Sequence, residues 1–70
     1  MFELTRQREL RGLSKRKLAQ LADLHPSRLS VIEHAKAVAY SGELRRLAGA
    51  LGWTGDPAAL MNEVDGAPPA

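Results

Sequence analysis

The spacing of apolar residues predicts five helices and no strands along the 70-residue chain. The first helix is expected from residue 2 to about residue 11. Gly12, which readily adopts the left-handed backbone of a helix terminus, ends it. Leu4 and Leu10 do not share a helix face, so this helix has a weaker pattern than the other four.

Two short amphipathic helices separated by a tight turn follow. Ser14 is a good N-cap for a helix that continues to about residue 22. Asp23 lies where the turn needs an adaptable backbone, and Asp tolerates positive φ better than most residues. Pro26 is favoured in a first helical turn, because its missing N–H would have no partner there. The next helix is therefore expected from Pro26 to about His34.

These two helices can bury one shared apolar face. The residues that form it are Leu18, Leu21, Ala22, Leu24, Leu29 and Ile32. The side chains left pointing away are Ser27, Arg28, Ser30, Val31 and His34. Two helices of this length, with a tight turn between them, are typical of helix-turn-helix DNA-binding domains.

Two more helices are expected in the second half of the chain. Residues 35–41 have no strong period and are interpreted as a loop. Residues 42–51 place apolar side chains at i, i+3, i+4 and i+7, a stripe suited to packing on other helices. Asp56 is a natural N-cap, so a fifth helix is expected from Pro57 to about Val64.

Length and composition restrict the class of protein. A chain of 70 residues makes one domain that buries only roughly 60% of its unfolded surface, so dimerisation would add stability. We expect this domain over residues 1–64 and a disordered tail over residues 65–70. Cysteine is absent, which excludes disulfides and thiolate zinc sites and favours a cytoplasmic protein. No apolar run approaches the ~20 residues of a membrane span, so no membrane partner is expected.

Positive charge is concentrated in the part of the chain that contains the two short helices. All ten Lys and Arg but only five of the eight acids lie in residues 1–46, which carry a net charge of +5 against −3 for residues 47–70. Lys and Arg that face phosphates gain free energy from counterion release. The asymmetry indicates a polyanionic partner, although scattered arginines are more often a solvated surface.

A set of residues with fixed spacing extends over nearly the whole chain. Its members are Leu4, Arg8, Gly12, Leu13, Ser14, Leu18, Ala19, Leu21, Ala22, Leu24, Leu29, Ser30, Ile32, Glu33, Lys36, Leu44, Leu47, Ala48, Ala50, Leu51 and Gly52. In this order and spacing, residues 4–64 resemble the Cro/CI (Xre) family of helix-turn-helix regulators. The resemblance implies an all-α, five-helix lambda-repressor-like domain that binds double-stranded operator DNA as a homodimer. Residues 26–34 would be the recognition helix in the major groove.

The resemblance and the residues together predict a repressor on a palindromic site, whose half-sites lie one helical turn, ~34 Å, apart. The chain departs from the family pattern in the turn and in the loop. Asp23 and Ala35 stand where glycine is frequent, and Lys15 replaces a common glutamine. Ala39 and Ser41 replace a proline and a leucine. These departures bear on individual contacts and on the shape of the loop.

Four residues of the recognition helix are candidates for base contacts. Arg28 is the strongest, because a guanidinium can span O6 and N7 of guanine, with about 1–3 kcal/mol of discrimination. The alternative for Arg28 is a phosphate contact or a salt bridge to a neighbour. Ser27 can hydrogen-bond to a base or a phosphate, and Val31 can contact a thymine methyl. Pro26 lies at the front of the same helix.

Further residues are expected at the phosphates. Lys15, Arg16 and Lys17 oppose the dipole of their helix at a cost of roughly 0.3–1 kcal/mol each. A phosphate there would meet Lys15 and free backbone N–H groups, which favours binding. The alternative is a solvated cationic cap, above all for Lys17. By resemblance, the loop after the recognition helix also contacts phosphates. The predicted phosphate contacts are Lys15, Arg16, Ser30, His34, Lys36 and Tyr40.

The remaining assignments are structural. By resemblance, Arg8 and Glu33 form a partly buried ion pair that links the first helix to the end of the third. Trp53 is interpreted as a core or dimer-interface residue rather than a platform for a base. The residues that a twofold partner would bury, unless they close the core of a single chain, are Trp53, Leu60, Met61 and Val64.

No enzymatic activity, metal or cofactor is expected. His25 and His34 are the two histidines, and the acids are dispersed without metal-ligand spacing. His25 is better explained as the residue that enters the third helix. The main alternative function is that of an antitoxin, which would bind a toxin protein and autoregulate its operon. An adaptor that has lost DNA binding is a third possibility, against which Arg28 and the cations at residues 15–17 argue.

Overall fold

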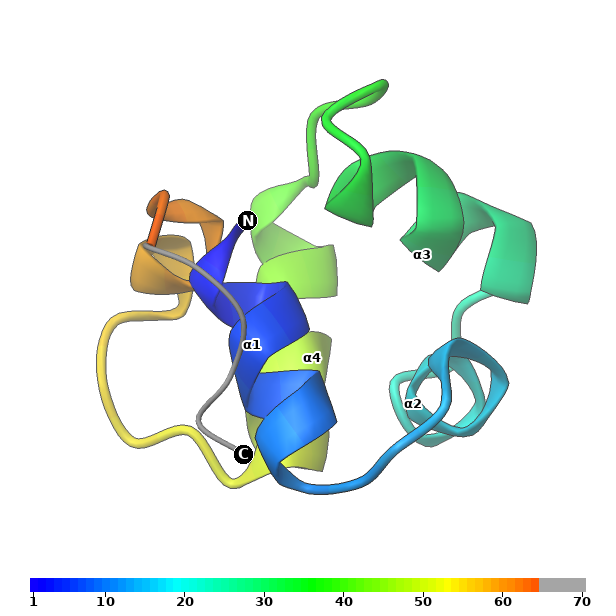
Figure 1. The fold of residues 1–70 in the computed structure, drawn as a ribbon, viewed down its shortest axis with the longest axis horizontal. Helices are drawn as coiled ribbons and strands as arrows, with labels where there is room; N and C mark the ends of the chain where they lie inside the picture. Colours follow the sequence, from blue (N-terminus) through cyan, green and yellow to red (C-terminus); the bar gives the residue numbers. More distant parts are fainter. Residues whose placement is uncertain (65–70) are drawn as a thin grey trace.

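The computed structural model describes residues 1–64, which form four α-helices and one short 3₁₀ helix (Figure 1). The elements are α1 (Glu3–Leu10), α2 (Lys15–Leu21), α3 (Pro26–Glu33), α4 (Ser41–Leu51) and the 3₁₀ helix η1 (Pro57–Met61). No strand occurs in these 64 residues, and an isolated antiparallel bridge joins Phe2 to Glu63. The all-α class is confirmed, whereas four α-helices replace the predicted five. The predicted tail, residues 65–70, lies outside the described residues.

The signals predicted around the first three helices act as expected. The Ser14 hydroxyl accepts the backbone N–H of Lys17 at 3.0 Å, and Pro26 is the first residue of α3. Gly12 and Asp23 adopt the left-handed backbone, with φ of 67° and 56°. The chain therefore turns sharply just after α1 and between α2 and α3.

The C-terminal element differs from its prediction. Asp56 accepts the N–H of Ala58 at 3.0 Å and Pro57 begins the helix, as expected. The helix is 3₁₀ rather than α, however, and it ends at Met61 instead of reaching Val64.

Pairing with the start of the chain accounts for this early end. The backbone N–H of Glu3 donates to the Asn62 carbonyl at 2.9 Å, and that of Val64 donates to the Met1 carbonyl at 2.8 Å. These long-range hydrogen bonds hold residues 62–64 extended and take the place of a last helical turn. The same contact explains why α1 begins one residue later than predicted, at Glu3.

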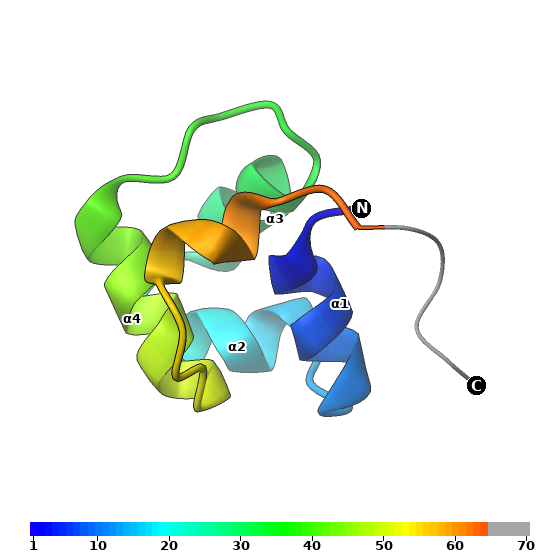
Figure 2. The same ribbon diagram turned by 90° about the vertical axis from the view of Figure 1, so that its left-hand side faces the viewer.

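All five elements meet in one core. α2 packs on α3 and α4, and η1 packs on α4 and α1. Figure 1 shows α2 and α3 together on one side of α1 and α4, and Figure 2 shows η1 lying across α1 and α4. The largest fully buried side chains are Leu4, Leu18, Leu29, Ile32, Leu47 and Leu60. Leu21, expected on the shared face of α2 and α3, is instead 51% exposed. No helix of residues 1–64 is both long and apolar enough to cross a membrane.

Candidate nucleic-acid interface

α2, residues 22–25 and α3 form a unit that is buried at the back and open at the front. Leu18 of α2 and Leu29 and Ile32 of α3 are fully buried in the core. The half-buried or exposed residues along the outer side of α3 are Pro26, Ser27, Ser30, Val31 and His34. A helix that is packed firmly from behind and carries short side chains in front fits the width of a DNA major groove.

His25 and Ser27 form a small network at the start of α3. The His25 Nδ1 accepts the backbone N–H of Ser27 at 3.1 Å, which makes His25 the N-cap. The Ser27 hydroxyl lies 2.6 Å from the same nitrogen. Because Nδ1 must accept from the backbone, the hydroxyl donates to it and Nε2 carries the proton of the neutral ring. The oxygen of Ser27 is left as a hydrogen-bond acceptor toward solvent.

His34, at the end of α3, uses its Nδ1 as a donor, whereas the Nδ1 of His25 is an acceptor. Its Nδ1 lies 2.8 Å from the Ser30 carbonyl oxygen, which can only accept, so Nδ1 is the donor. In the neutral ring, Nε2 is then an acceptor. Only the protonated imidazolium of His34 can donate a hydrogen bond to a phosphate.

Arg28 is engaged within the protein rather than free on the surface. Its Nε donates to Oε2 of Glu43 and its Nη2 donates to Oε1 of Glu43, both at 2.8 Å. Nη2 also donates to the Val38 carbonyl at 2.8 Å, and Cζ lies 5.2 Å from the ring centroid of Tyr40. Of the alternatives drawn from the sequence, the structure therefore contains the salt bridge to a neighbour.

Glu43 is a well-stabilised carboxylate in the first turn of α4. The hydrogen bonds from Arg28 lower the pKa of Glu43 from its ordinary value of 4.5 to about 2, against the opposing effect of burial. The backbone N–H of Tyr40, which donates to Oε1 at 2.9 Å, acts in the same direction as Arg28. The hydrogen bond to Glu43 in turn raises the pKa of Arg28.

The predicted phosphate contacts come from the start of α2, from α3 and from the loop after α3. Lys15 is half-buried, whereas Arg16, Lys36 and Tyr40 are exposed. The salt bridges found within residues 1–64 engage arginines of α1 and α3 and the N-terminal amine, and they leave Lys15, Arg16 and Lys36 without a carboxylate partner there. These three cations are therefore available to a polyanion.

Arg8 and Glu33, the pair that the family resemblance predicts, are joined in the structure. Nε and Nη2 of Arg8 donate to the two carboxylate oxygens of Glu33 at 2.9 and 3.1 Å. The third nitrogen, Nη1, donates to the Leu13 carbonyl at 2.8 Å. This cluster fixes the end of α3 to α1 and to the turn that precedes α2.

The residues predicted for a dimer interface differ in how far they are buried in the single chain. Leu60 is fully buried in the core of the single chain, in keeping with the alternative that these residues close that core. Trp53, Met61 and Val64 are half-buried, and the indole Nε1 of Trp53 donates to the Asp56 carbonyl at 3.0 Å. These three retain some accessible surface.

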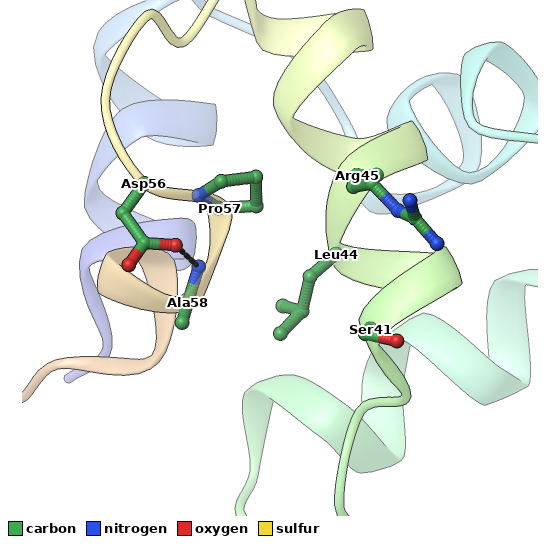
Figure 3. Close-up of a pocket in the computed structure, with 6 residues that line it drawn as sticks. All are labelled: Ser41, Leu44, Arg45, Asp56, Pro57 and Ala58. Atoms are coloured by element: carbon green, nitrogen blue, oxygen red, sulfur yellow. Dashed lines mark hydrogen bonds between the residues drawn. The ribbon is translucent and has the colours of Figure 1, made fainter.

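A hollow between α4 and η1 is shown in Figure 3. It is lined by Ser41, Leu44, Arg45, Asp56, Pro57 and Ala58. The Asp56 carboxylate is used as the cap of η1, and the Arg45 guanidinium points away from Pro57 (Figure 3). Within residues 1–64, no group of three or more His, Cys, Asp and Glu could hold a metal ion. The hollow offers apolar surface rather than a set of reactive groups.

Sequence reasoning missed two residues beside the open face. His25 was expected only to enter α3, and its Nδ1 cap replaces the usual Ser, Thr, Asp or Asn. Glu43 had no predicted role. A usable signal was its position three residues after Tyr40, where an acid accepts the N–H of the N-cap residue.

A sequence profile whose description is "Helix-turn-helix domain" matches residues 2–61. The matched segment includes every helical element from α1 to η1. No curated protein and no solved structure shows a significant match to the chain.

Proposed function

The chain belongs to the helix-turn-helix domain family, and on this basis we propose that it is a sequence-specific transcriptional regulator whose α3 binds the major groove of operator DNA. One observation carries the proposal: the inner side of α3 is fixed by the fully buried Leu29 and Ile32, while its outer side is accessible. A rigid helix can hold its side chains at fixed positions relative to the base edges.

The base contacts are proposed for Ser27 and Val31, with Pro26 beside them. The Ser27 hydroxyl donates to His25, so its oxygen would accept from a base. In the major groove, the donors are the amino groups of cytosine N4 and adenine N6. Val31 would contact a thymine methyl. Ser27 is therefore expected to favour cytosine or adenine.

The phosphate contacts are proposed for residues on both sides of α3. They comprise Lys15, Arg16, Ser30, His34, Lys36 and Tyr40. Contacts of this kind set the position and affinity of the protein on the duplex without selecting a sequence. The contact of His34 requires its protonated form, because Nδ1 is already bound to the Ser30 carbonyl.

A homodimer on a palindromic operator is the proposed active form, and repression by occupying that operator is the proposed outcome. The accessible parts of Trp53, Met61 and Val64 are the proposed contact between the two copies. Two copies of α3 would then enter successive major grooves ~34 Å apart.

In vitro selection from a random pool of DNA duplexes tests this function. The recovered sites should share a motif with twofold symmetry and half-site centres one helical turn apart, about 10 base pairs. A pool that stays random after repeated rounds, with binding to heparin and DNA of equal salt dependence, would contradict sequence-specific binding.

Lys15→Ala tests the phosphate contacts. Loss of one phosphate contact should weaken binding by a similar factor for all sequences and reduce the slope of log K against log salt by about one. Arg6→Ala is the charge-matched control, because the Arg6 guanidinium is already paired with Glu3 at 3.0 Å. An equal change in slope for both variants would show that general charge, and not a contact at Lys15, is responsible.

An antitoxin is the second candidate function, and exposed apolar side chains favour it. Val38, beside a hollow lined by Phe2, Ala39 and Met61, is 83% exposed. A toxin partner would cover this surface. In cells that express the product of an adjacent toxin gene, co-expression of this chain should then restore growth. Val38→Ser, which removes the apolar side chain without adding a charge, should abolish the rescue while DNA binding persists.

A further inference from the structure

The guanidinium of Arg28 is bound along one edge and keeps a second edge for a ligand. A guanidinium has two edges on which N–H groups of two different nitrogens point the same way. Nε and Nη2 form the first edge, and both donate to the carboxylate of Glu43 at 2.8 Å. Nη1 and Nη2 form the second edge. Within residues 1–64, Nη1 has no acceptor, and the other donor of Nη2 binds the Val38 carbonyl at 2.8 Å.

The second edge becomes available when one hydrogen bond is exchanged. The bond from Nη2 to the Val38 carbonyl is exposed to solvent, and Val38 itself is 83% exposed. Water can replace Arg28 at this carbonyl, so the exchange leaves no buried acceptor unpaired. The two bonds to Glu43 stay as they are. A ligand with two neighbouring acceptors would therefore gain one hydrogen bond more than Arg28 gives up.

Glu43 and Tyr40 fix the orientation of this edge. The hydrogen bond from Arg28 lowers the pKa of Glu43 to about 2, so this carboxylate is ionised at neutral pH, and the backbone N–H of Tyr40 holds its Oε1 at 2.9 Å. The Tyr40 ring lies against one face of the guanidinium, with 5.2 Å between Cζ and the ring centroid. A side chain restrained in this way loses little conformational entropy on binding.

The position and the charge of Arg28 favour guanine over a phosphate as this ligand. Arg28 is the third residue of α3, and the N-terminal residues of a recognition helix contact base edges. Glu43 neutralises the charge of Arg28, and its carboxylate would repel a phosphate. Guanine offers two uncharged acceptors, O6 and N7, whose spacing fits two parallel N–H groups.

We propose, on the premise that the protein binds DNA as described above, that Arg28 binds a guanine through Nη1 and Nη2 and that Glu43 is the positioning residue that orients it. The guanine displaces the Val38 carbonyl. Arg28 and Glu43 form a clasp between α3 and α4 that is kept when DNA binds. Each half-site then contains one guanine beside the bases contacted by Ser27 and Val31.

Selection from a random pool of DNA duplexes tests the contact of Arg28. The wild type should prefer guanine at one position per half-site by about 5-fold to 100-fold. Arg28→Ala should lose this preference and recover the rest of the motif. Arg28→Lys, which keeps the charge without the two-nitrogen edge, should lose it as well, and it replaces Arg28→Ala if that variant is unfolded.

Glu43→Gln separates positioning from support of the fold. The glutamine keeps an oxygen for the Tyr40 N–H but offers Arg28 one acceptor and one donor in place of a carboxylate. The guanine preference should fall several-fold, while binding to DNA without the motif becomes tighter and more dependent on salt, because Arg28 is no longer neutralised. A purely structural role would weaken both kinds of binding. Glu63→Gln, which removes the same charge at the exposed pair with the N-terminus, should keep the guanine preference.

Modified bases test the same contact on the wild-type protein. Replacing the selected guanine by 7-deazaguanine removes the N7 acceptor and should weaken binding several-fold. Inosine lacks only the minor-groove amino group and should bind as guanine does. Arg28→Ala should bind all three duplexes with equal affinity.

Three results would overturn the proposal while leaving DNA binding intact. In the first, Arg28→Ala recovers the wild-type motif and weakens all sites by one common factor, as expected for a phosphate contact. In the second, Glu43→Gln keeps the full guanine preference. In the third, 7-deazaguanine binds the wild type as well as guanine does. A wild type that recovers no motif would instead contradict the proposed function, and this inference with it.

Discussion

Two arginine–glutamate pairs hold α3, and they are built from the same parts with different exposure. In each pair, Nε and Nη2 of the arginine bind both oxygens of the glutamate, and a further bond reaches a loop carbonyl, Leu13 for Arg8 and Val38 for Arg28. The side chains of Arg8 and Glu33 are 11% and 3% exposed, whereas those of Arg28 and Glu43 are 28% and 11% exposed.

The difference in exposure separates a pair that stabilises the fold from one that faces a ligand surface. Arg8 uses all three nitrogens, and its carboxylate partner is almost without solvent. The second carboxylate near Arg8, that of Glu9, lies farther away, at 3.7 Å from Nη2. Arg28 keeps Nη1 available beside the outer side of α3, where solvent or DNA can compete for it. Burial thus decides which pair can change partners.

Breaking the buried pair should have the largest effect. Arg8→Met removes the charge but keeps the length of the side chain, and it leaves the Glu33 carboxylate buried without its partner. We expect a loss of about 3–5 kcal/mol in the free energy of unfolding, measured by urea denaturation followed by circular dichroism. Glu63→Gln, at an exposed pair, should change stability by less than about 0.5 kcal/mol. A loss below about 1 kcal/mol for Arg8→Met would show that the two pairs do not differ in this way.

The clasp of Arg28 and Glu43 should respond to acid. The folded state lowers the pKa of Glu43 to about 2, so this carboxylate contributes stability above its ordinary pKa of 4.5 that is lost as the pH falls toward 2. Urea midpoints measured between about pH 2 and 6 should therefore decline less steeply for Glu43→Gln than for the wild type. Parallel profiles would mean that Glu43 does not titrate with folding.

Local signals in the sequence predicted the elements. The differences between that prediction and the structure arise from long-range contacts. Ser14, Asp23 and Pro26 each act on their immediate neighbours, and α2 and α3 lie as predicted. The capped start at Pro57 was also correct. Its helix stops early because residues 62–64 pair with residues 1–3 at the other end of the domain, which no local pattern encodes.

The candidate site also divides into features that local spacing predicts and contacts between distant residues that it does not. The outer face of α3 follows from helical spacing alone. The clasp does not, because Arg28 and Glu43 are 15 residues apart and meet only through the path of the loop between α3 and α4. That loop is one of the places where the chain departs from the family pattern. Arg8 and Glu33 could be paired beforehand only through the family resemblance, since their separation of 25 residues carries no local signal either.

The smallest change in stability is expected from a substitution in the turn that lies between the two pairs. Ala35 follows the end of α3, just after Glu33, and begins the path toward Val38. It has φ of 59°, a left-handed backbone that costs a residue with a Cβ about 1 kcal/mol or more. Ala35→Gly should therefore raise the free energy of unfolding by about 1 kcal/mol, a Tm increase of about 4–8 °C for a domain of this size.

Ala37→Gly is the control for this substitution, because Ala37 lies in the same loop without a positive φ. There the added freedom of the unfolded chain is the main effect, so stability should fall by about 0.4–1 kcal/mol. If both variants are destabilised, the strain relieved at Ala35 is smaller than the entropy that the new glycine gives to the unfolded chain. If Ala35→Gly is stabilised and also changes the coupling between Arg28 and Glu43, the turn sets the geometry of the clasp as well as the end of α3.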